Sequence, residues 1–155
     1  MPTKPSSLDK QLEIQEGKIL FPYDDATGKV LKKGDTIVGN ITIGVGHNLS
    51  ANGISNAVCQ QILNEDKSIA YDAVMHHLPW ATKLSSARLG VLVNMTFNMG
   101  IEGLLTFTNM LKYCENGQYD LAAEEMLNSK WASQVKTRAT ALAEQMRTDT
   151  WIFKG

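Results

Sequence analysis

The chain has 155 residues, of which 43% are hydrophobic and 20% are charged. This length and composition suffice to bury a core, and they predict a globular chain of one domain or of two small lobes. Lys and Arg (15) nearly balance Asp and Glu (16), so the net charge of −1 creates no overall field toward nucleic acid or anionic membranes. We therefore expect no nucleic-acid partner.

The amino-terminal stretch MPTKPSSLDKQLEIQ contains no apolar run of the kind found in a signal peptide. A membrane-spanning helix needs about 18 consecutive apolar residues, and no such run occurs. We expect a chain that is made in a cytoplasm and does not insert stably into a membrane. Cys59 and Cys114 lack the spacing of a metal site or a disulfide framework, so both are expected to be reduced, buried thiols.

The first expected element is a short helix over SSLDKQLEIQE, residues 6–16. Leu8 and Leu12 are spaced i,i+4, and Gly17 fits the position just after a helix. Glu16 then lies in the last turn, where the negative end of the helix dipole favours a protonated carboxyl by about 0.3–1 kcal/mol. That effect suits a general acid, although a single glutamate at such a position is more often a surface carboxylate.

Turn residues and β-formers follow from Tyr23 onward. Gly39-Asn40 separates TIV from ITI as a two-residue hairpin signal, so residues 29–46 are expected to form a small antiparallel sheet. The alternation in ITIGVGH places Thr42 and two glycines on one face, which would be polar, smooth and open to a ligand.

Helical patterns fill the rest of the chain. One helix is expected from an N-cap at Ser55 to the block imposed by Pro79, spanning roughly 35 Å and tying the β-containing lobe to a second body. Residues 85–100, SSARLGVLVNMTFNMG, are apolar nearly all round, as in the central helix of a helical lobe that ends at Gly100. Three further helical stretches complete that lobe: TFTNMLKYCENG, YDLAAEEMLNSKWAS and TRATALAEQMRTDTWIF.

The polar candidates become informative as a group. Taken singly, Asp24 and Asp25 are simplest as turn formers, and Thr42 as a strand residue. Together, Glu16, one of these aspartates and Thr42 would converge on one cleft between the sheet and the helical lobe. Two carboxylates across a cleft, one protonated and one ionised, are what glycoside hydrolysis needs.

Neither a metal nor a cofactor is expected. The pair His76-His77 has no acid or cysteine at ligand spacing beyond Asp72, and it is interpreted as a solvated pair. The stretch GVGH lacks the lysine and hydroxyl residue of a phosphate-binding loop.

Four motifs together resemble the phage-type lysozymes of glycoside hydrolase family 24, and the resemblance covers nearly the whole chain from Leu12 to Trp151. These motifs are EG (16–17), YDDATG (23–28), TIGVGH (42–47) and VNMTFNMG (93–100). The resemblance implies one lysozyme-like α+β domain over residues 1–155. A small antiparallel β-sheet lobe, about 17–65, is joined by a long helix to a mainly helical lobe, about 80–155 plus the N-terminal helix.

The resemblance implies a muramidase that hydrolyses the β-1,4 bond between N-acetylmuramic acid and N-acetylglucosamine in peptidoglycan, with inversion at the anomeric carbon. Its partner would be peptidoglycan glycan strands. Glu16 matches the family's general acid, and Asp25 matches its second carboxylate. Thr42 matches the threonine that helps to hold the attacking water.

Further matches concern the surroundings of the site. Phe97 matches a substrate-binding aromatic residue of the cleft wall, and Arg138 matches the arginine that approaches the catalytic glutamate. His47 matches a histidine whose usual role is structural, through pairing with an acid, and Asp66 is its expected partner. The chain departs from the family pattern by inserting KVLKKGDTIVGNI between Gly28 and Thr42, which predicts a longer β-region.

The biological expectation is a phage endolysin for host cell lysis. It would accumulate as a monomer in the host cytoplasm and need a separate membrane pore, a holin, to reach the cell wall in the periplasm. Two alternatives remain: a lytic transglycosylase, which would leave an anhydro sugar, and a non-catalytic wall-binding module. Analysis of product reducing ends separates the first alternative, and a turbidity assay on permeabilised cells separates the second.

Overall fold

The structure, a computed structural model, describes residues 6–154. Its internal contacts divide the chain into an amino-terminal unit that ends at Cys59 and a carboxy-terminal unit that begins at Gln60. Helices accompany one small antiparallel sheet, so the predicted α+β class is confirmed. The lobe boundaries expected from the sequence stay a prediction; the contacts group the N-terminal helix with the first unit.

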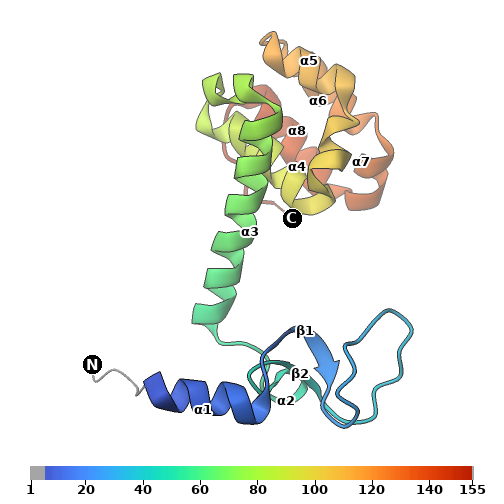
Figure 1. Cartoon of the computed structure of the whole chain (residues 1–155). Coiled ribbons are helices and arrows are strands. Elements are labelled where there is room, and N and C mark those ends of the chain that lie inside the picture. Colours follow the sequence, from blue (N-terminus) through green and yellow to red (C-terminus); the bar gives the residue numbers. More distant parts are fainter. Residues whose placement is uncertain (1–5, 155) are drawn as a thin grey trace. The chain divides into compact units, whose positions relative to one another are not determined.

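The amino-terminal unit consists of a helix, a three-stranded sheet and a short second helix (Figure 1). These elements are α1 (Ser6–Glu16), β1 (Ile19–Asp24), β2 (Ile41–Gly44), β3 (His47–Asn48) and α2 (Leu49–Asn52). The backbone N–H of Gly17 donates to the Glu13 carbonyl at 3.0 Å, and Gly17 has a φ of 80°. This left-handed residue ends α1 as the sequence predicts.

The sheet differs from the expected one. Its antiparallel strand order is β1-β2-β3, and β1, which the sequence did not predict, contains Pro22. An edge strand tolerates a proline because its outer side needs no ladder hydrogen bond. The predicted hairpin at Gly39-Asn40 is wrong, since residues 31–40 form no strand and only Val30 makes an isolated bridge, to Tyr23.

A side chain explains this difference. The backbone N–H groups of Val38 and Gly39 donate to the Asp24 carboxylate at 2.6 and 3.0 Å. These two donors are therefore unavailable to a partner strand, and the segment after Gly28 runs as a long loop that returns to the sheet at β2 (Figure 1).

The carboxy-terminal unit is helical. Its elements are the greater part of α3 (Asn56–His77), then η1 (Pro79–Lys83), α4 (Ser86–Leu105), α5 (Thr108–Glu115), α6 (Tyr119–Leu127), α7 (Lys130–Val135) and α8 (Thr137–Thr148). The predicted ends of α3 are confirmed: the Ser55 hydroxyl accepts from the Val58 N–H at 3.2 Å, and Pro79 opens η1. Gly100, the expected end of the central helix, is instead a kink within α4, with φ 78° and ψ 164°.

The apolar core lies in the carboxy-terminal unit. Its largest fully buried apolar side chains are Val74, Val91, Leu92, Met95, Leu104, Met110, Met126 and Met146. In the described part of the amino-terminal unit, by contrast, the buried residues are Tyr23, Asp24 and Thr42. Two of these three are polar, so hydrogen bonds carry much of the order in that unit.

The two cysteines have different environments. Cys114 is buried, with its sulfur 3.6 Å from that of Met110 and 3.7 Å from that of Met146, and burial raises its pKa to about 12. Cys59 is exposed on α3, so the prediction that both are buried is wrong for this residue. Across residues 6–154, no helix by itself has the length and apolarity of a membrane span; α4 and α5, bent by 105°, meet that criterion only as a pair.

Candidate functional site

Glu16 is the last residue of α1, and its carboxylate lies against Gly46 in the turn between β2 and β3. A Cβ atom built on Gly46 would lie 3.0 Å from Glu16 Oε2 and 3.3 Å from Cδ, closer than nearly all real Cβ contacts. The absence of a side chain at Gly46 therefore makes room for the Glu16 carboxylate. The sequence predicts a glycine surface open to a ligand here, but at Gly46 this surface contacts the Glu16 carboxylate.

Asp24 and Asp25 have opposite surroundings. Asp24 is 2% exposed, and its carboxylate accepts three backbone hydrogen bonds, from Val38, Ala26 and Gly39. The bond from Val38, followed by the other two, holds the pKa of Asp24 below its ordinary value of 3.8. Asp24 thus fastens the loop to the end of β1.

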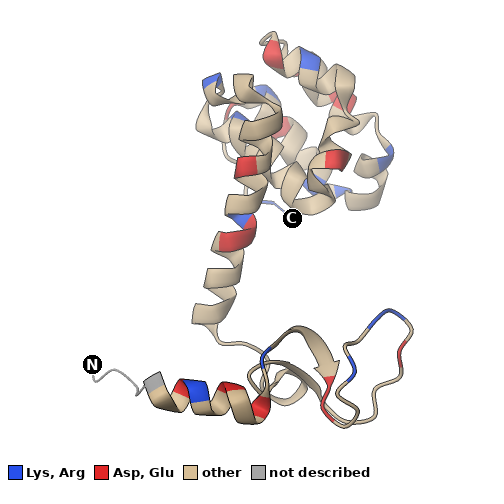
Figure 2. Cartoon of the chain, in the orientation of Figure 1, with Lys and Arg blue, Asp and Glu red and all other residues tan. Residues whose placement is uncertain are grey.

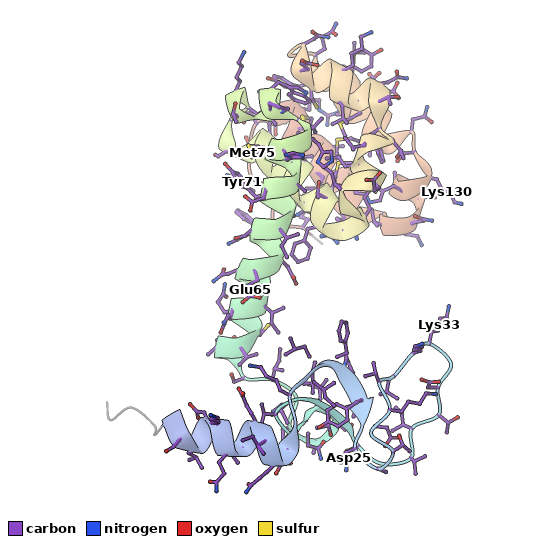
Figure 3. The ribbon with its side chains drawn as sticks, in the orientation of Figure 1. Asp25, Lys33, Glu65, Tyr71, Met75 and Lys130 are labelled. Atoms are coloured by element: carbon purple, nitrogen blue, oxygen red, sulfur yellow. The ribbon has the colours of Figure 1, made fainter. Side chains whose placement is uncertain are left out.

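Asp25 is exposed at the start of that loop, and Figure 3 labels it together with Lys33 farther along the loop. Its carboxylate accepts from the Asn40 backbone N–H at 2.6 Å and from Asn40 Nδ2 at 3.2 Å. Because Asp24 is enclosed by backbone donors and Asp25 is open to solvent, the environment favours Asp25 as the aspartate that meets a substrate. Its catalytic role stays a prediction.

Thr42 lies in the central strand β2 and is 3% exposed. Tyr23 and Asn48 lie directly opposite it on the flanking strands, and such cross-strand neighbours pack side by side. Thr42 is therefore not displayed on an open strand face as predicted. Its hydroxyl lies 3.4 Å from the carbonyl of Asn40, the residue that also holds Asp25.

His47 lies in β3, and its Nε2 is 2.6 Å from the carbonyl oxygen of Gly53. A carbonyl cannot donate, so Nε2 carries the proton and the ring ties the sheet to the end of α2. The expected partner Asp66 belongs to the other unit, and that pairing stays a prediction.

The structure brings Phe97 and Arg138 together within the carboxy-terminal unit. Both line a pocket of about 340 Å³ formed by α3, α4, α8 and the C-terminal segment, with Lys67 and Trp151 among its other residues. Phe97 is 45% exposed, and Arg138 Nε donates to Asn94 Oδ1 at 3.0 Å. The pocket combines apolar surface with two cationic side chains.

Sequence reasoning missed two asparagines that bind candidate site residues: Asn94 accepts from Arg138, and Asn40 donates to Asp25. Asn94 precedes Phe97 by three positions on α4, so the VNMTFNMG motif and helical spacing gave a usable signal for it. Asn40 was interpreted as half of a hairpin turn, and no local pattern shows that it binds Asp25. Across residues 6–154, no three His, Cys, Asp or Glu side chains gather as metal ligands.

Acidic side chains are prominent on α1 and at the end of β1 in the amino-terminal unit (Figure 2). Of these, Glu13 is engaged with Lys18 in an exposed ion pair of 3.2 Å, and Asp24 is engaged by backbone donors. Apart from Asp9 in the first turn of α1, this leaves Glu16 beside the Gly46 turn and Asp25 at the start of the loop. Glycoside hydrolysis needs two carboxyl groups, one protonated and one ionised, and this fold with these two acids is compatible with that class of enzyme.

Comparison with known proteins agrees with that class. A family model described as phage lysozyme matches residues 16–148. Two relatives from Dictyostelium discoideum are similar over nearly their whole length: "Probable T4-type lysozyme 1" with 25% identity and "Probable T4-type lysozyme 2" with 27% identity. Each alignment covers 94% of this chain and 96% of the relative.

The chain belongs to the phage lysozyme family. It is a glycoside hydrolase of lysozyme type that acts on cell-wall peptidoglycan, and its α+β fold is lysozyme-like. The family resemblance drawn from the EG, YDDATG, TIGVGH and VNMTFNMG motifs is thereby confirmed.

Proposed function

We propose that this lysozyme cleaves the β-1,4 bond between N-acetylmuramic acid and N-acetylglucosamine in a single displacement with inversion. Glu16 is the general acid that protonates the leaving oxygen. Asp25 is the carboxylate that activates a water on the opposite side of the sugar ring, and Thr42 helps to hold that water.

One observation carries this proposal: the amino-terminal unit presents two acids in different settings. Glu16 lies at the carboxyl end of a helix against a glycine turn, whereas Asp25 accepts hydrogen bonds on both carboxylate oxygens. Each Asp25 oxygen keeps a free lone pair for a water proton. An inverting enzyme needs about 6.5–9.5 Å between its two carboxyl groups, and the proposal requires that spacing when substrate is bound.

The remaining residues have supporting roles in the proposal. Phe97, exposed on α4, binds the glycan by contact with a sugar ring, as exposed aromatic side chains commonly do. Arg138, whose Nε donates to Asn94 Oδ1, is assigned a supporting role through the family resemblance, and His47 keeps the sheet attached to α2.

The proposal extends to biology. The protein is a monomeric phage endolysin made in the host cytoplasm, and a holin pore gives it access to the wall in the periplasm. Lysis of the host at phage release is its role. The support for this step is family membership.

The test replaces the proposed acid without changing its size. Glu16→Gln should abolish clearing of outer-membrane-permeabilised cells while the circular dichroism spectrum and melting temperature stay unchanged, because the amide cannot give up a proton. Glu13→Gln, three residues earlier on the same helix, is the matched control and should lyse normally. A Glu16→Gln protein that still clears cells would contradict the assignment of Glu16 as the general acid.

Product chemistry separates the alternatives. A lytic transglycosylase would leave anhydro ends instead of reducing ends. A non-catalytic wall-binding module would release no soluble fragments even as wild type.

A further inference from the structure

Asn40 lies at the end of the loop that follows Gly28 and contacts two of the proposed catalytic residues, Asp25 and Thr42. It makes three hydrogen bonds with Asp25: its N–H and its Nδ2 donate to the two carboxylate oxygens at 2.6 and 3.2 Å, and its carbonyl accepts from the Asp25 N–H at 3.0 Å. The same carbonyl lies 3.4 Å from the Thr42 hydroxyl. Asn40 therefore contacts both groups that the proposed mechanism assigns to the attacking water, the Asp25 carboxylate and the Thr42 hydroxyl.

The loop is built to place Asn40 there. Asp24 fixes the two residues that precede it, Val38 and Gly39, through their backbone N–H groups. Gly39 passes so close to Asp25 that any Cβ at this position would collide with the Asp25 carboxylate. Two features therefore bring the backbone at Asn40 close to Asp25: the buried Asp24 carboxylate holds residues 38 and 39, and Gly39 has no side chain.

These contacts constrain the Asp25 side chain. Two donors on separate carboxylate oxygens oppose rotation of the carboxylate, and they leave it in a single orientation with lone pairs free for a water. A general base depends on such geometry, because a misplacement of about 1 Å can cost roughly 10²-fold in rate.

We propose that Asn40 is a positioning residue for hydrolysis, which orients the Asp25 carboxylate toward the attacking water. The inference rests on the proposed function, since it assigns Asp25 and Thr42 to the water side. It gives the loop between Gly28 and β2 a role: its last residue supplies the donors that hold the carboxylate.

Two substitutions test this role by removing different amounts of the contact. Asn40→Asp keeps the size of the side chain but sets a second carboxylate where Nδ2 donates, so kcat should fall by about 10²-fold. Asn40→Ala removes only the Nδ2 bond, and kcat should fall by about tenfold. In both variants KM should change by less than about threefold, because uniform substrate binding is not affected.

The measurements are kcat and KM for release of soluble fragments from purified peptidoglycan, with the melting temperature of every variant. Asn56→Asp adds the same charge at an exposed position at the start of α3, and it should behave as wild type. A merely structural role predicts that kcat follows the melting temperature, so kcat losses that appear only in proportion to a fall in melting temperature would overturn the inference. Wild-type kcat in Asn40→Asp would also overturn it.

Asp25→Asn and Glu16→Gln distinguish this failure from that of the proposed function. If both are inactive while Asn40→Asp is fully active, the inference fails and the function stands. If Asp25→Asn has wild-type kcat, the assignment of Asp25 fails, and with it the inference.

Discussion

Asp24 and Asp25 are neighbours in the chain, yet the structure gives them unlike tasks. Nothing in YDDATG separates them, because either aspartate fits a turn before Ala-Thr-Gly. The difference comes from the loop segment that ends at Asn40, which encloses one carboxylate with backbone donors and holds the other at the surface. A residue's role in this region is decided by partners about 15 positions away, as the sequence separations of these bonds show.

Asp24 should give the protein an acid-sensitive stability. Its pKa is lowered in the folded state, so its stabilising contribution is present above about pH 4 and is lost as the pH falls through the folded-state value. Asp24→Asn should lower the melting temperature at pH 7, and the difference from wild type should shrink as the pH falls below about 4.

Thermal unfolding followed by circular dichroism across this pH range measures the effect. Asp9→Asn, at an exposed position on α1, is the control and should change little. A constant gap between Asp24→Asn and wild type at all pH values would contradict the account.

We expect Gly46 to be required for the position of the Glu16 carboxylate as well as for the backbone conformation of the turn. Gly46→Ala adds a Cβ 3.0 Å from Glu16 Oε2 at a residue with φ of 64°, so it both strains the turn by about 1–2 kcal/mol and displaces the carboxylate. Because the carboxylate must shift by roughly a few tenths of an ångström, we expect kcat to fall by about tenfold.

Gly44→Ala is the matched control, because Gly44 has a φ of 69° with open space where a Cβ would lie. It should lose similar stability, measured by urea denaturation, and keep most of its kcat. Equal losses of activity in the two variants would refute a specific role for Gly46.

At the scale of elements, helices were predictable where their ends carry local signals. Gly17 ends α1, Ser55 caps α3, and Pro79 blocks its continuation, each through contacts within a few residues. The sheet was less predictable, since β1 holds a proline and the hairpin signal at Gly39-Asn40 lost its backbone donors to a distant carboxylate. Glu16 and Asp25 followed from motifs, whereas the Asn40 contact left no trace in local sequence.

The carboxyl end of α8 depends on a side chain from α4. The Arg88 guanidinium donates to the carbonyls of Met146 and Arg147 at 2.8 and 3.1 Å, stacks 3.6 Å from the centre of the Tyr119 ring and pairs with Asp149 at 3.6 Å. Lysine keeps the charge but cannot reproduce this planar fork.

Arg88→Lys should therefore lower the free energy of unfolding by about 2 kcal/mol, measured by urea denaturation. Arg147→Lys, at an exposed position of α8, should stay within about 0.5 kcal/mol of wild type. An Arg88→Lys protein as stable as this control would show that the contacts are dispensable.

At the scale of the whole molecule, the apolar core and the proposed catalytic residues belong to different units. The apolar core belongs to the carboxy-terminal unit, and Glu16, Asp25 and Thr42 belong to the amino-terminal unit, whose described buried residues are few and mostly polar. The patterns of helix and strand residues and the family resemblance predicted the α+β class correctly. They carried no information on how hydrogen bonds order the smaller unit.

The near-neutral charge of the chain predicts a weak response to salt. With a net charge of −1, long-range attraction to the anionic wall is small, so screening has little to remove. The KM for peptidoglycan should change by less than about threefold between roughly 20 and 200 mM NaCl. A change of tenfold or more would indicate a local charged surface that dominates binding.

The central claim is that Glu16 and Asp25 cleave the glycan by a single displacement through water. The most direct test is the anomeric configuration of the first-formed product, followed by proton NMR on a soluble peptidoglycan oligosaccharide before mutarotation. The account predicts the α-anomer from wild type and no product from Glu16→Gln or Asp25→Asn. A β-anomer, which signals retention, or an anhydro product would contradict it.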